Sequence, residues 1–444
     1  MDVLDMADWR ELKYESKSCN MREYSSPINT RGVIMKLSML EEALLPYEKK
    51  LAAQERLRRI LGVKDVDRPT YEQYITGPIE QFDRQKIAFG YLSPDNPYGE
   101  ELRKRFKART GTDSRKALPY SELGTEERIG QSLASAGVRV CREYVPEPLP
   151  ITPPEGRVEV TDPKWMSRLV KKAALLFGAE IVRIAEVDQR WVYQGADVPH
   201  KYVIVLAIYH FPSLNDTAPS FFAGLSGGNA YSRLTFIMTQ LTDFIRGMGY
   251  DAAYHETGGP TADILVVPTA IDAGIGEFAR NGRVLSPEFG INMRMKSVTT
   301  DMPLEVDKPI SFGVHKFCMA CENCATYCPA NAIPFGPPTD TPIDTYNNPG
   351  YRKWYVNAER CLTFWSANKK KWNSCGGRCL SVCPWNKPRT PFHNIVRWMG
   401  IHSPEVVKKM LVWSDQKVYG RTRKIGNVWA DGESKEERKA ATPI

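Results

Sequence analysis

The chain has no hydrophobic run long enough to cross a membrane. Its longest apolar run, Tyr202–Ile208, has the length of one strand, whereas a spanning helix needs about 20 apolar residues. The N-terminus also lacks a charged leader with an apolar core, and it contains no twin-arginine signal. We therefore expect a soluble chain, and removal of an earlier leader stays open.

The chain also has no strong excess of one charge. Its 60 Lys and Arg residues against 52 Asp and Glu give a net charge of +8, and this excess is scattered. The densest basic runs are Lys369–Lys371 and Arg421–Lys424. A solvated surface explains them most simply, while docking of an acidic electron donor or a nucleic acid is the alternative.

Few cysteines lie outside two tight groups, and those few, Cys19 and Cys141, indicate no disulfide framework. The two groups read Cys318-x2-Cys321-x2-Cys324-x3-Cys328-Pro329 and Cys361-x13-Cys375-x3-Cys379-x3-Cys383-Pro384. This is the spacing of iron–sulfur ligands, and structural zinc sites with two-plus-two spacing fit it poorly. The sequence therefore predicts two [4Fe–4S] clusters and a protein that transfers electrons.

Each cluster is expected to take three ligands from one group and the fourth from the other, as in bacterial ferredoxins. Cluster 1 then takes Cys318, Cys321, Cys324 and Cys383, and cluster 2 takes Cys361, Cys375, Cys379 and Cys328. The second group has a wider gap that contains Gly376 and Gly377. Because glycines let the backbone loop outward, we expect ligation to survive there, with a changed reduction potential.

Helix and strand patterns alternate from Asp162 onward and predict an α/β domain. The expected helices are 34–61, split near Pro46, then 165–177 and 231–248, and the expected strands are 180–185, 201–209, 251–254 and 264–267. Residues 64–160 show no sustained periodicity, and their proline-rich end indicates a linker or a rigid wrap. We divide the chain into an N-terminal region wrapping the core (1–160), the α/β domain (161–310), the cluster module (311–390) and a C-terminal extension (391–444).

Several separate elements resemble the respiratory corrinoid and iron–sulfur reductive dehalogenases. They are Phe312–Cys318, Cys361–Trp365, Cys383–Asn386 and Gly276–Gly282 followed by Phe289-Gly290, within a similarity over roughly 160–395. The resemblance implies an α/β (α+β) fold with a nitroreductase-like corrinoid-binding domain and a C-terminal bacterial-ferredoxin-like module with two [4Fe–4S] clusters. It also implies the removal of halogen from a small organohalide such as a chlorinated alkane or alkene.

The resemblance implies partners and a location as well. Such enzymes take part in anaerobic organohalide respiration, leave the cytoplasm folded by the twin-arginine route, and are held at the outer face of the cytoplasmic membrane by a small anchor protein. No flavin or NAD domain is appended, which implies a separate low-potential electron donor. A homodimer stays open, and nucleic acid is not an expected partner.

The corrinoid is implied by the resemblance alone. A lower histidine ligand would show Asp-x-His-x2-Gly, but Ala253 stands where His255-Glu256-Thr257-Gly258 would need the Asp. We therefore expect a base-off cobalamin without a protein ligand below the cobalt.

The resemblance assigns the proton donor to Tyr231 and places Arg294 beside it. Replacing a halogen by hydrogen takes two electrons and one proton, and a guanidinium that stabilises the phenolate makes Tyr231 a better acid and helps to hold departing halide. The loop 254–260 lacks the Asn that some relatives use at the halogen, so His255 and Thr257 are candidates there. Trp365 either shields a cluster or forms a wall of the apolar pocket.

Two alternatives stay open. Epoxyqueuosine reductase, which modifies tRNA, shares the corrinoid and the two clusters, but its α/β domain begins almost at its N-terminus. The Cys361-Leu362-Thr363-Phe364-Trp365 element favours the dehalogenases. A plain electron-carrier subunit without a substrate is the third interpretation.

Overall fold

A computed structural model describes residues 39–88, 90, 96–111, 119–143, 147–151, 156–256, 262–367 and 377–419. The chain forms two compact units, Met1–Pro46 and Tyr47–Ile444, and every contact discussed below lies within the second. Among the positions singled out above, Cys19, Thr257, Cys375, Lys369–Lys371 and Arg421–Lys424 lie outside the described residues. No helix in the described ranges is both long and apolar enough to span a bilayer.

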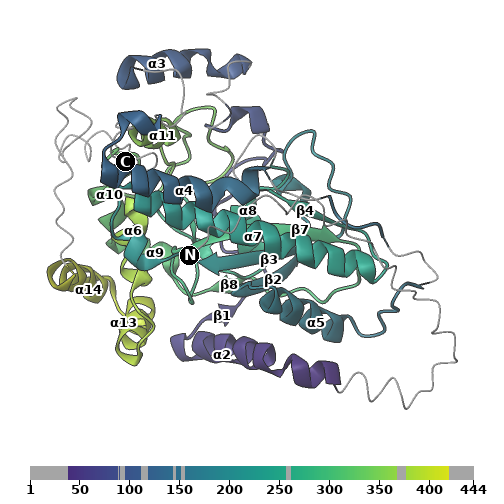
Figure 1. Ribbon diagram of the computed structural model, residues 1–444. Coiled ribbons are helices and arrows are strands. Elements are labelled where there is room, and N and C mark those ends of the chain that lie inside the picture. The colour runs from purple at the N-terminus through teal and green to yellow at the C-terminus, as the bar shows by residue number, and fades with distance from the viewer. Residues whose placement is uncertain are drawn as a thin grey trace, which may run out of the picture. The chain divides into compact units, whose positions relative to one another are not determined.

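A four-stranded antiparallel sheet forms the α/β part (Figure 1). In sheet order its strands are β2 (Ile181–Glu186), β3 (Tyr202–Tyr209), β7 (Met293–Thr300) and β4 (Ala252–His255). The two central strands pair over their whole length, from Tyr202 opposite Thr300 to Tyr209 opposite Met293. Residues 203–208 of β3 are completely buried, because helices cover both faces of the sheet.

Alternate side chains of β7 point to the two covering helices, α7 (Phe221–Gly247) and α8 (Val266–Asp272). Met293 packs in the apolar cluster that includes α8. Its neighbour Arg294 instead lies over Tyr231 of α7. The period of two along a strand therefore turns even-numbered residues of β7 toward α7.

Most of the predicted elements in this domain are confirmed. Strands β2, β3 and β4 match three expected ranges, and α5 (Pro163–Leu176) begins after Asp162, whose carboxylate accepts from the amides of Lys164 and Trp165. The prediction of a strand at 264–267 is wrong, because α8 already begins at Val266. The second half of the expected 34–61 helix is α2 (Leu45–Leu61), which has Pro46 in its first turn.

Two helices in the region without periodicity were missed, α3 (Glu100–Thr110) and α4 (Thr125–Glu143). Helix α4 packs along α7 through glycines. A Cβ at Gly130 would lie 2.8 Å from Phe221 Cβ, and one at Gly228 of α7 would lie 3.2 Å from Val138 Cβ. Glycines on both helices let them approach closely, and the amphipathic pattern of α4 was overlooked among these glycines.

The same glycines explain why α7 starts ten residues before the predicted position. Gly224, Gly227 and Gly228 lie inside the helix, which Ser220 caps by accepting from the amide of Ala223 at 3.1 Å. Strand β7 was also missed, because its sequence Met-Arg-Met-Lys-Ser-Val-Thr-Thr mixes charged and apolar residues on a strand that is buried on both faces.

The cluster module is built from short helices joined by irregular segments. Its helices are α9 (Val314–Ala320), α10 (Asn323–Thr326), α11 (Ala358–Ala367) and α12 (Arg378–Ser381), and α13 (Pro391–His402) and α14 (Glu405–Val418) follow and pack against α9. Besides several 3-10 helices, other short elements are α6 (Pro212–Asn215), β1 (Lys64–Asp65), β5 (Glu277–Phe278), β6 (Val284–Leu285) and β8 (Ile310–Ser311).

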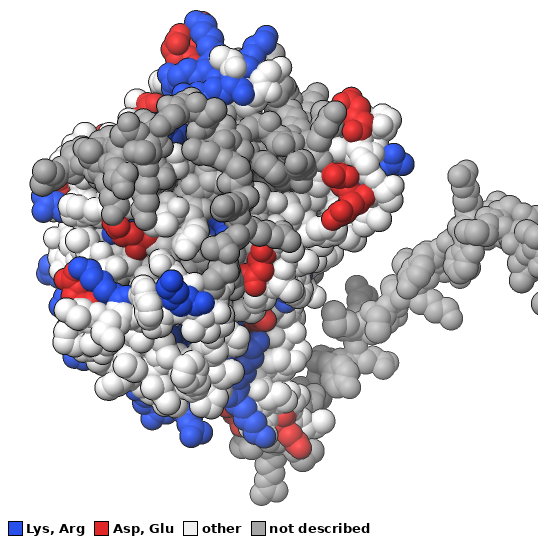
Figure 2. Space-filling model, turned by 90° about the vertical axis from the view of Figure 1, so that its left-hand side faces the viewer, with Lys and Arg blue, Asp and Glu red and all other residues white. Residues whose placement is uncertain are grey.

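On the face drawn in Figure 2, acidic and basic side chains lie singly or in small mixed groups. The basic side chains at its top belong to α3, which contains five Lys and Arg residues, and Lys104 there pairs with Glu100 and Glu101. This mixed pattern agrees with the small net charge and is typical of a solvated surface.

Candidate functional site

Four of the predicted cluster ligands lie together around α9. Cys318 and Cys321 share a buried apolar cluster with Leu380 and Trp385, and Cys383 packs against the same residues. Cys318 and Cys321 are also electrostatic neighbours of Cys324. The structure therefore brings together the four cysteines expected for cluster 1, although Cys383 comes from the second group.

Three of the four cysteines expected for cluster 2 also meet. Cys328 and Cys361 pack against Phe364 of α11, and Cys379 of α12 joins Cys328 in a neighbouring apolar cluster. The fourth predicted ligand, Cys375, lies outside the described residues. Cys328 of the first sequence group thus lies with Cys361 and Cys379 of the second group, as expected.

These thiols are difficult to ionise in the protein alone. Burial raises the pKa of Cys321 to about 12, and burial followed by neighbouring thiols raises the pKa of Cys324 well above its ordinary range. Thiolates in such surroundings need cations, and iron in a cluster supplies them. The donor set therefore fits two iron–sulfur clusters.

The two residues predicted for proton transfer are in contact. The guanidinium carbon of Arg294 lies 4.9 Å from the centre of the Tyr231 ring. Tyr231 lies on α7, and Arg294 lies on the part of β7 that faces this helix. Gly227, one turn before Tyr231, leaves room, since a Cβ there would lie 3.4 Å from Nη2 of Arg294. A strand and a helix far apart in sequence thus form a tyrosine–arginine pair.

Sequence reasoning missed a second cation at this place, Lys296. Its side chain is completely buried and donates to Thr235 Oγ1 at 2.7 Å and to Glu256 Oε1 at 2.5 Å. Its Nζ lies 5.9 Å from the centre of the Tyr231 ring. Lys296 follows Arg294 by two residues, so recognising β7 as a strand would have put both cations on one face.

Several polar atoms near this pair have no protein partner among the described residues. Both ring nitrogens of His210, Oδ1 of Asn215, Oγ of Ser226 and Nε of Arg294 are buried without a hydrogen bond. Burial, then the charges of Arg294 and Arg283, lowers the pKa of His210 well below its ordinary value, so its imidazole is neutral. Their donors and acceptors can bind a polar group that enters this part of the fold. The amide side chains of a corrinoid fit this set.

Several known proteins are similar to this chain in sequence. Residues 317–387 match the family model of the 4Fe-4S dicluster domain, which confirms the two-cluster prediction. Over 309 residues, 61% of this chain and 60% of the relative, the chain is 32% identical to the tetrachloroethene reductive dehalogenase of Sulfurospirillum multivorans. It is also 32% identical over 282 residues to the same enzyme of Desulfitobacterium hafniense, covering 52% of this chain and 50% of the relative. The resemblance to the reductive dehalogenases is confirmed.

The fold agrees with a reductive dehalogenase too. The catabolic reductive dehalogenase NpRdhA, as its K488Q variant, superposes on 85% of this chain and 53% of its own with a TM-score of 0.66 at 22% identity. The epoxyqueuosine reductase of Escherichia coli is 26% identical over 196 residues, 38% of this chain and 44% of the relative. The chain spans about half to three fifths of the dehalogenase relatives named above.

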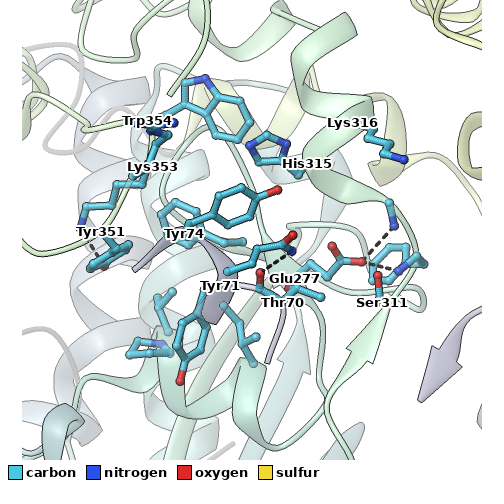
Figure 3. Close-up of a pocket in the computed structure, with 18 of the residues that line it drawn as sticks. Thr70, Tyr71, Tyr74, Glu277, Ser311, His315, Lys316, Tyr351, Lys353 and Trp354 are labelled. Carbon is cyan, nitrogen blue, oxygen red and sulfur yellow. Dashed lines mark hydrogen bonds between the residues drawn. The ribbon is translucent and has the colours of Figure 1, made fainter. Parts of the chain in front are cut away.

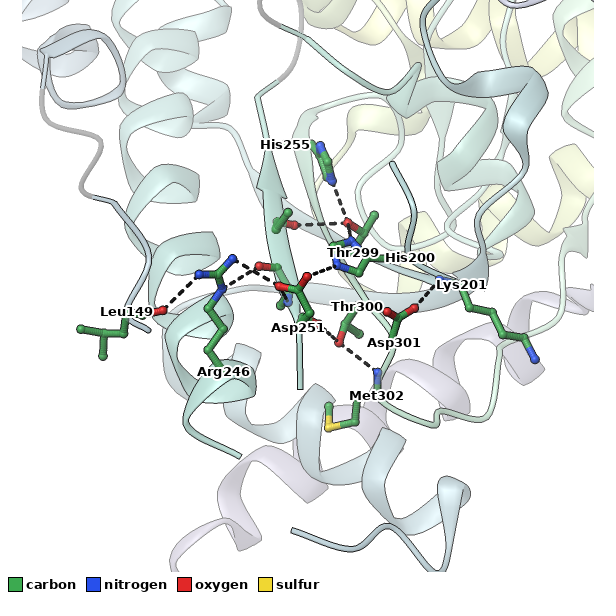
Figure 4. Close-up of polar contacts among 12 residues, drawn as sticks. Leu149, His200, Lys201, Arg246, Asp251, His255, Thr299, Thr300, Asp301 and Met302 are labelled. Atoms are coloured by element: carbon green, nitrogen blue, oxygen red, sulfur yellow. Dashed lines mark hydrogen bonds and ion pairs between the residues drawn. The ribbon is translucent and has the colours of Figure 1, made fainter. Parts of the chain in front are cut away.

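His255, a candidate for the halogen pocket, lies in β4 with both ring nitrogens bonded inside the fold, and Figure 4 shows its bond to Thr299. Its Nε2 lies 2.8 Å from Thr299 Oγ1, and its Nδ1 lies 3.1 Å from Asp263 Oδ2. The same hydroxyl lies 2.8 Å from Nδ1 of His200. These bonds join β4 to β7, and neither nitrogen is left to contact a substrate.

Trp365 lies on α11 and packs in the apolar cluster of Cys328 and Cys361. This position is close to the cysteines expected for cluster 2, as the shielding interpretation requires. Its place in a substrate pocket stays a prediction.

A separate cavity of about 340 Å³ lies beside the start of α9 (Figure 3). Tyr74, His315 and Trp354 stack in its wall, with ring centres 4.7 Å and 4.9 Å apart. Glu277 lines it as well, and burial raises the pKa of this carboxyl group to about 7. The lining contains none of the residues predicted for the chemistry.

Proposed function

We propose that the chain is a corrinoid-dependent reductive dehalogenase, an oxidoreductase that replaces halogen by hydrogen on a small organohalide such as a chlorinated alkane or alkene. The reaction consumes two electrons and one proton and releases a halide ion. The contact of 4.9 Å between Arg294 and Tyr231, beside unpartnered buried polar atoms, carries this proposal. The names of the relatives support it.

The cofactors in this proposal are two [4Fe–4S] clusters and a base-off cobalamin without a protein lower ligand. When bound, the corrinoid supplies the electron transfer to the carbon–halogen bond. His210, Asn215 and Ser226 would hold its amide side chains, since their buried polar atoms have no partner among the described residues. A solved reductive dehalogenase described as carrying out B12-dependent dehalogenation has the same fold, with a TM-score of 0.63.

Tyr231 holds the proton at its hydroxyl group and donates it to the carbon that loses the halogen. Arg294 and Lys296 put two positive charges near the ring, which stabilises the phenolate left behind. Arg294 also attracts the departing halide. Trp365 and Thr257 are proposed for the pocket wall, and His255 only as a weaker candidate, because its ring nitrogens are both bonded.

Electrons reach this site through the clusters in the proposed ligand sets. Cys379, proposed for cluster 2, lies on α12, which packs against α6 and hence near Asn215. Cluster 1 lies on the side of α9, α13 and α14. Cluster 2 would therefore deliver electrons to the corrinoid, and cluster 1 would receive them from outside.

The wider setting is also proposed. An external low-potential donor supplies the electrons, and the enzyme acts in anaerobic organohalide respiration at the outer face of the cytoplasmic membrane, reached by the twin-arginine route. A small anchor protein and a second copy of the chain are the proposed partners.

The test is an anaerobic assay of the chain loaded with iron, sulfide and cobalamin and reduced by a viologen dye. Chlorinated ethenes and alkanes should release halide, whereas an epoxyqueuosine-containing tRNA should stay unchanged. Modified tRNA without halide release would favour epoxyqueuosine reductase, and neither product would favour an electron carrier.

The variant Tyr231→Phe should lose at least about a hundredfold in halide release, because general acid catalysis of this kind contributes that much. Its iron and cobalt contents should stay normal. Tyr250→Phe is the matched control, since it removes a hydroxyl that donates to Val158 at 2.8 Å beyond the far end of α7. Full activity of Tyr231→Phe would remove this residue from the mechanism.

A further inference from the structure

The segment Gly276–Gly282 resembles a dehalogenase element, yet the proposed reaction uses none of its residues. Arg280 in this segment is completely buried. Two of its nitrogens donate to the carbonyl oxygen of Cys318, Nη2 at 2.8 Å and Nε at 3.2 Å. The guanidinium group is thus bonded directly to the main chain of a cysteine proposed for cluster 1.

The other contacts of Arg280 are neutral as well. Its Nη1 donates to the carbonyl oxygens of Pro334 at 3.0 Å and Gly336 at 2.8 Å, and its Cζ lies 4.7 Å from the ring centre of Trp354. Within the described ranges, no carboxylate forms an ion pair with Arg280. Its hydrogen bonds are therefore well satisfied, but its charge is not compensated.

The nearest acidic residue on the same segment has another role. Glu277 accepts from the amides of Phe312 and Gly313, at 3.0 Å from the latter, where α9 begins (Figure 3). A carboxylate at the start of a helix satisfies amides that have no partner within the helix. Glu277 thus accepts from amides at the start of α9, and Arg280 donates to the carbonyl of Cys318 within this helix.

Two other cations near the proposed cluster 1 differ from each other, because Lys387 is paired with a carboxylate and the hydrogen-bond partners of Arg397 are neutral. Lys387 forms an ion pair with Asp415 at 2.9 Å. Arg397 donates to the carbonyl oxygens of Trp385 and Lys387, next to Cys383, and to Asn394 Oδ1 at 2.9 Å. Arg397 is hence a second buried cation near this cluster, on the side of Cys383, whereas Arg280 lies on the side of Cys318.

A buried charge without a counter-ion is costly in a protein interior. A [4Fe–4S] cluster with four thiolate ligands is negative in both oxidation states and gains one further negative charge on reduction. A fixed cation beside it favours the reduced state and raises the reduction potential.

We propose that Arg280 is a counter-ion of cluster 1, on the side of Cys318, and that its charge raises the reduction potential of that cluster. The inference relies on the ligand set in the proposed function. Arg280 is a positioning residue, because it acts on the cluster through the carbonyl of Cys318 and through its field, without touching a substrate.

The test compares Arg280→Gln, which removes the charge, with Arg280→Lys, which keeps it. Arg352→Gln is the matched control, since Arg352 is exposed and pairs with Asp340 at 2.6 Å. Each variant is loaded with iron and sulfide under argon, its iron is counted, and both cluster potentials are measured by redox titration followed by electron paramagnetic resonance.

We expect one of the two potentials to become more negative in Arg280→Gln and to return most of the way in Arg280→Lys, with no change in Arg352→Gln. Loss of one cluster in Arg280→Gln but not in Arg280→Lys would also support the counter-ion role. Unchanged potentials in Arg280→Gln, or equal shifts or equal iron loss in both variants, would overturn it. If the unmodified chain bound fewer than two clusters, the proposed function itself would fail instead.

Discussion

Different interactions stabilise the sheet domain and the cluster module. In the sheet, six consecutive residues of β3 are completely buried, and regular strand pairing satisfies the main chain. In the module, helices of four to ten residues are joined by irregular segments, and buried charged side chains such as Arg280, Arg378 and Arg397 lie between them. We therefore expect the first region to be stabilised mainly by apolar burial and the second to depend also on the binding of its cysteines to iron.

The largest expected effect therefore comes from a proposed ligand of cluster 1. Cys324→Ala should remove one cluster, so the bound iron should fall by about half and halide release should stop. Limited proteolysis should then cut the module first and leave the sheet domain protected. Iron analysis and mass spectrometry of the fragments check this. Equal protection of both regions would contradict the proposed difference.

A core substitution in β3 should show the reverse pattern. Leu206→Ala removes a completely buried side chain and should lower the free energy of unfolding by about 2–5 kcal/mol. The iron content of the folded protein should stay unchanged, because the cysteines lie elsewhere. Denaturant unfolding followed by circular dichroism measures the first quantity. A loss of iron at native conditions would show that the two regions are coupled.

The last expected effect concerns Glu277, which accepts from the amide of Gly313 at the start of α9. Burial raises the pKa of Glu277 in the folded chain to about 7 from an ordinary value of 4.5, so between these values the folded chain holds a proton that the unfolded chain has released. The free energy of unfolding should therefore fall as the pH rises from 4.5 to 7. Glu277→Gln should remove this part of the pH dependence, as measured by denaturant unfolding at several pH values. An identical slope in both proteins would contradict it.

The sequence was most informative where chemistry demands fixed spacing or fixed end signals. The cysteine intervals predicted the module, and Asp162 followed by Pro163 predicted the start of α5. These features act locally, so they can be detected without knowledge of the fold.

Sequence reasoning missed two elements at or near the candidate site, strand β7 and helix α4. Strand β7 places Arg294 and Lys296 on the face toward α7, and these charges obscured its pattern. Helix α4 meets α7 through Gly130, Gly137 and Gly228, which indicate a loop when neighbours are unknown. Tertiary contacts decide such segments, and a single sequence does not contain them.

The glycine contact between α4 and α7 also limits how this protein can be engineered. Gly228 meets α4 three residues before Tyr231, and a methyl group at Gly137 would lie 2.7 Å from Leu225 Cδ1. Any added bulk in this seam would separate α4 from α7 or press α7 toward the sheet, and Tyr231 would shift relative to Arg294. Libraries intended to broaden the range of halocarbons should therefore leave these glycines untouched, although none of them contacts a substrate in the proposed mechanism.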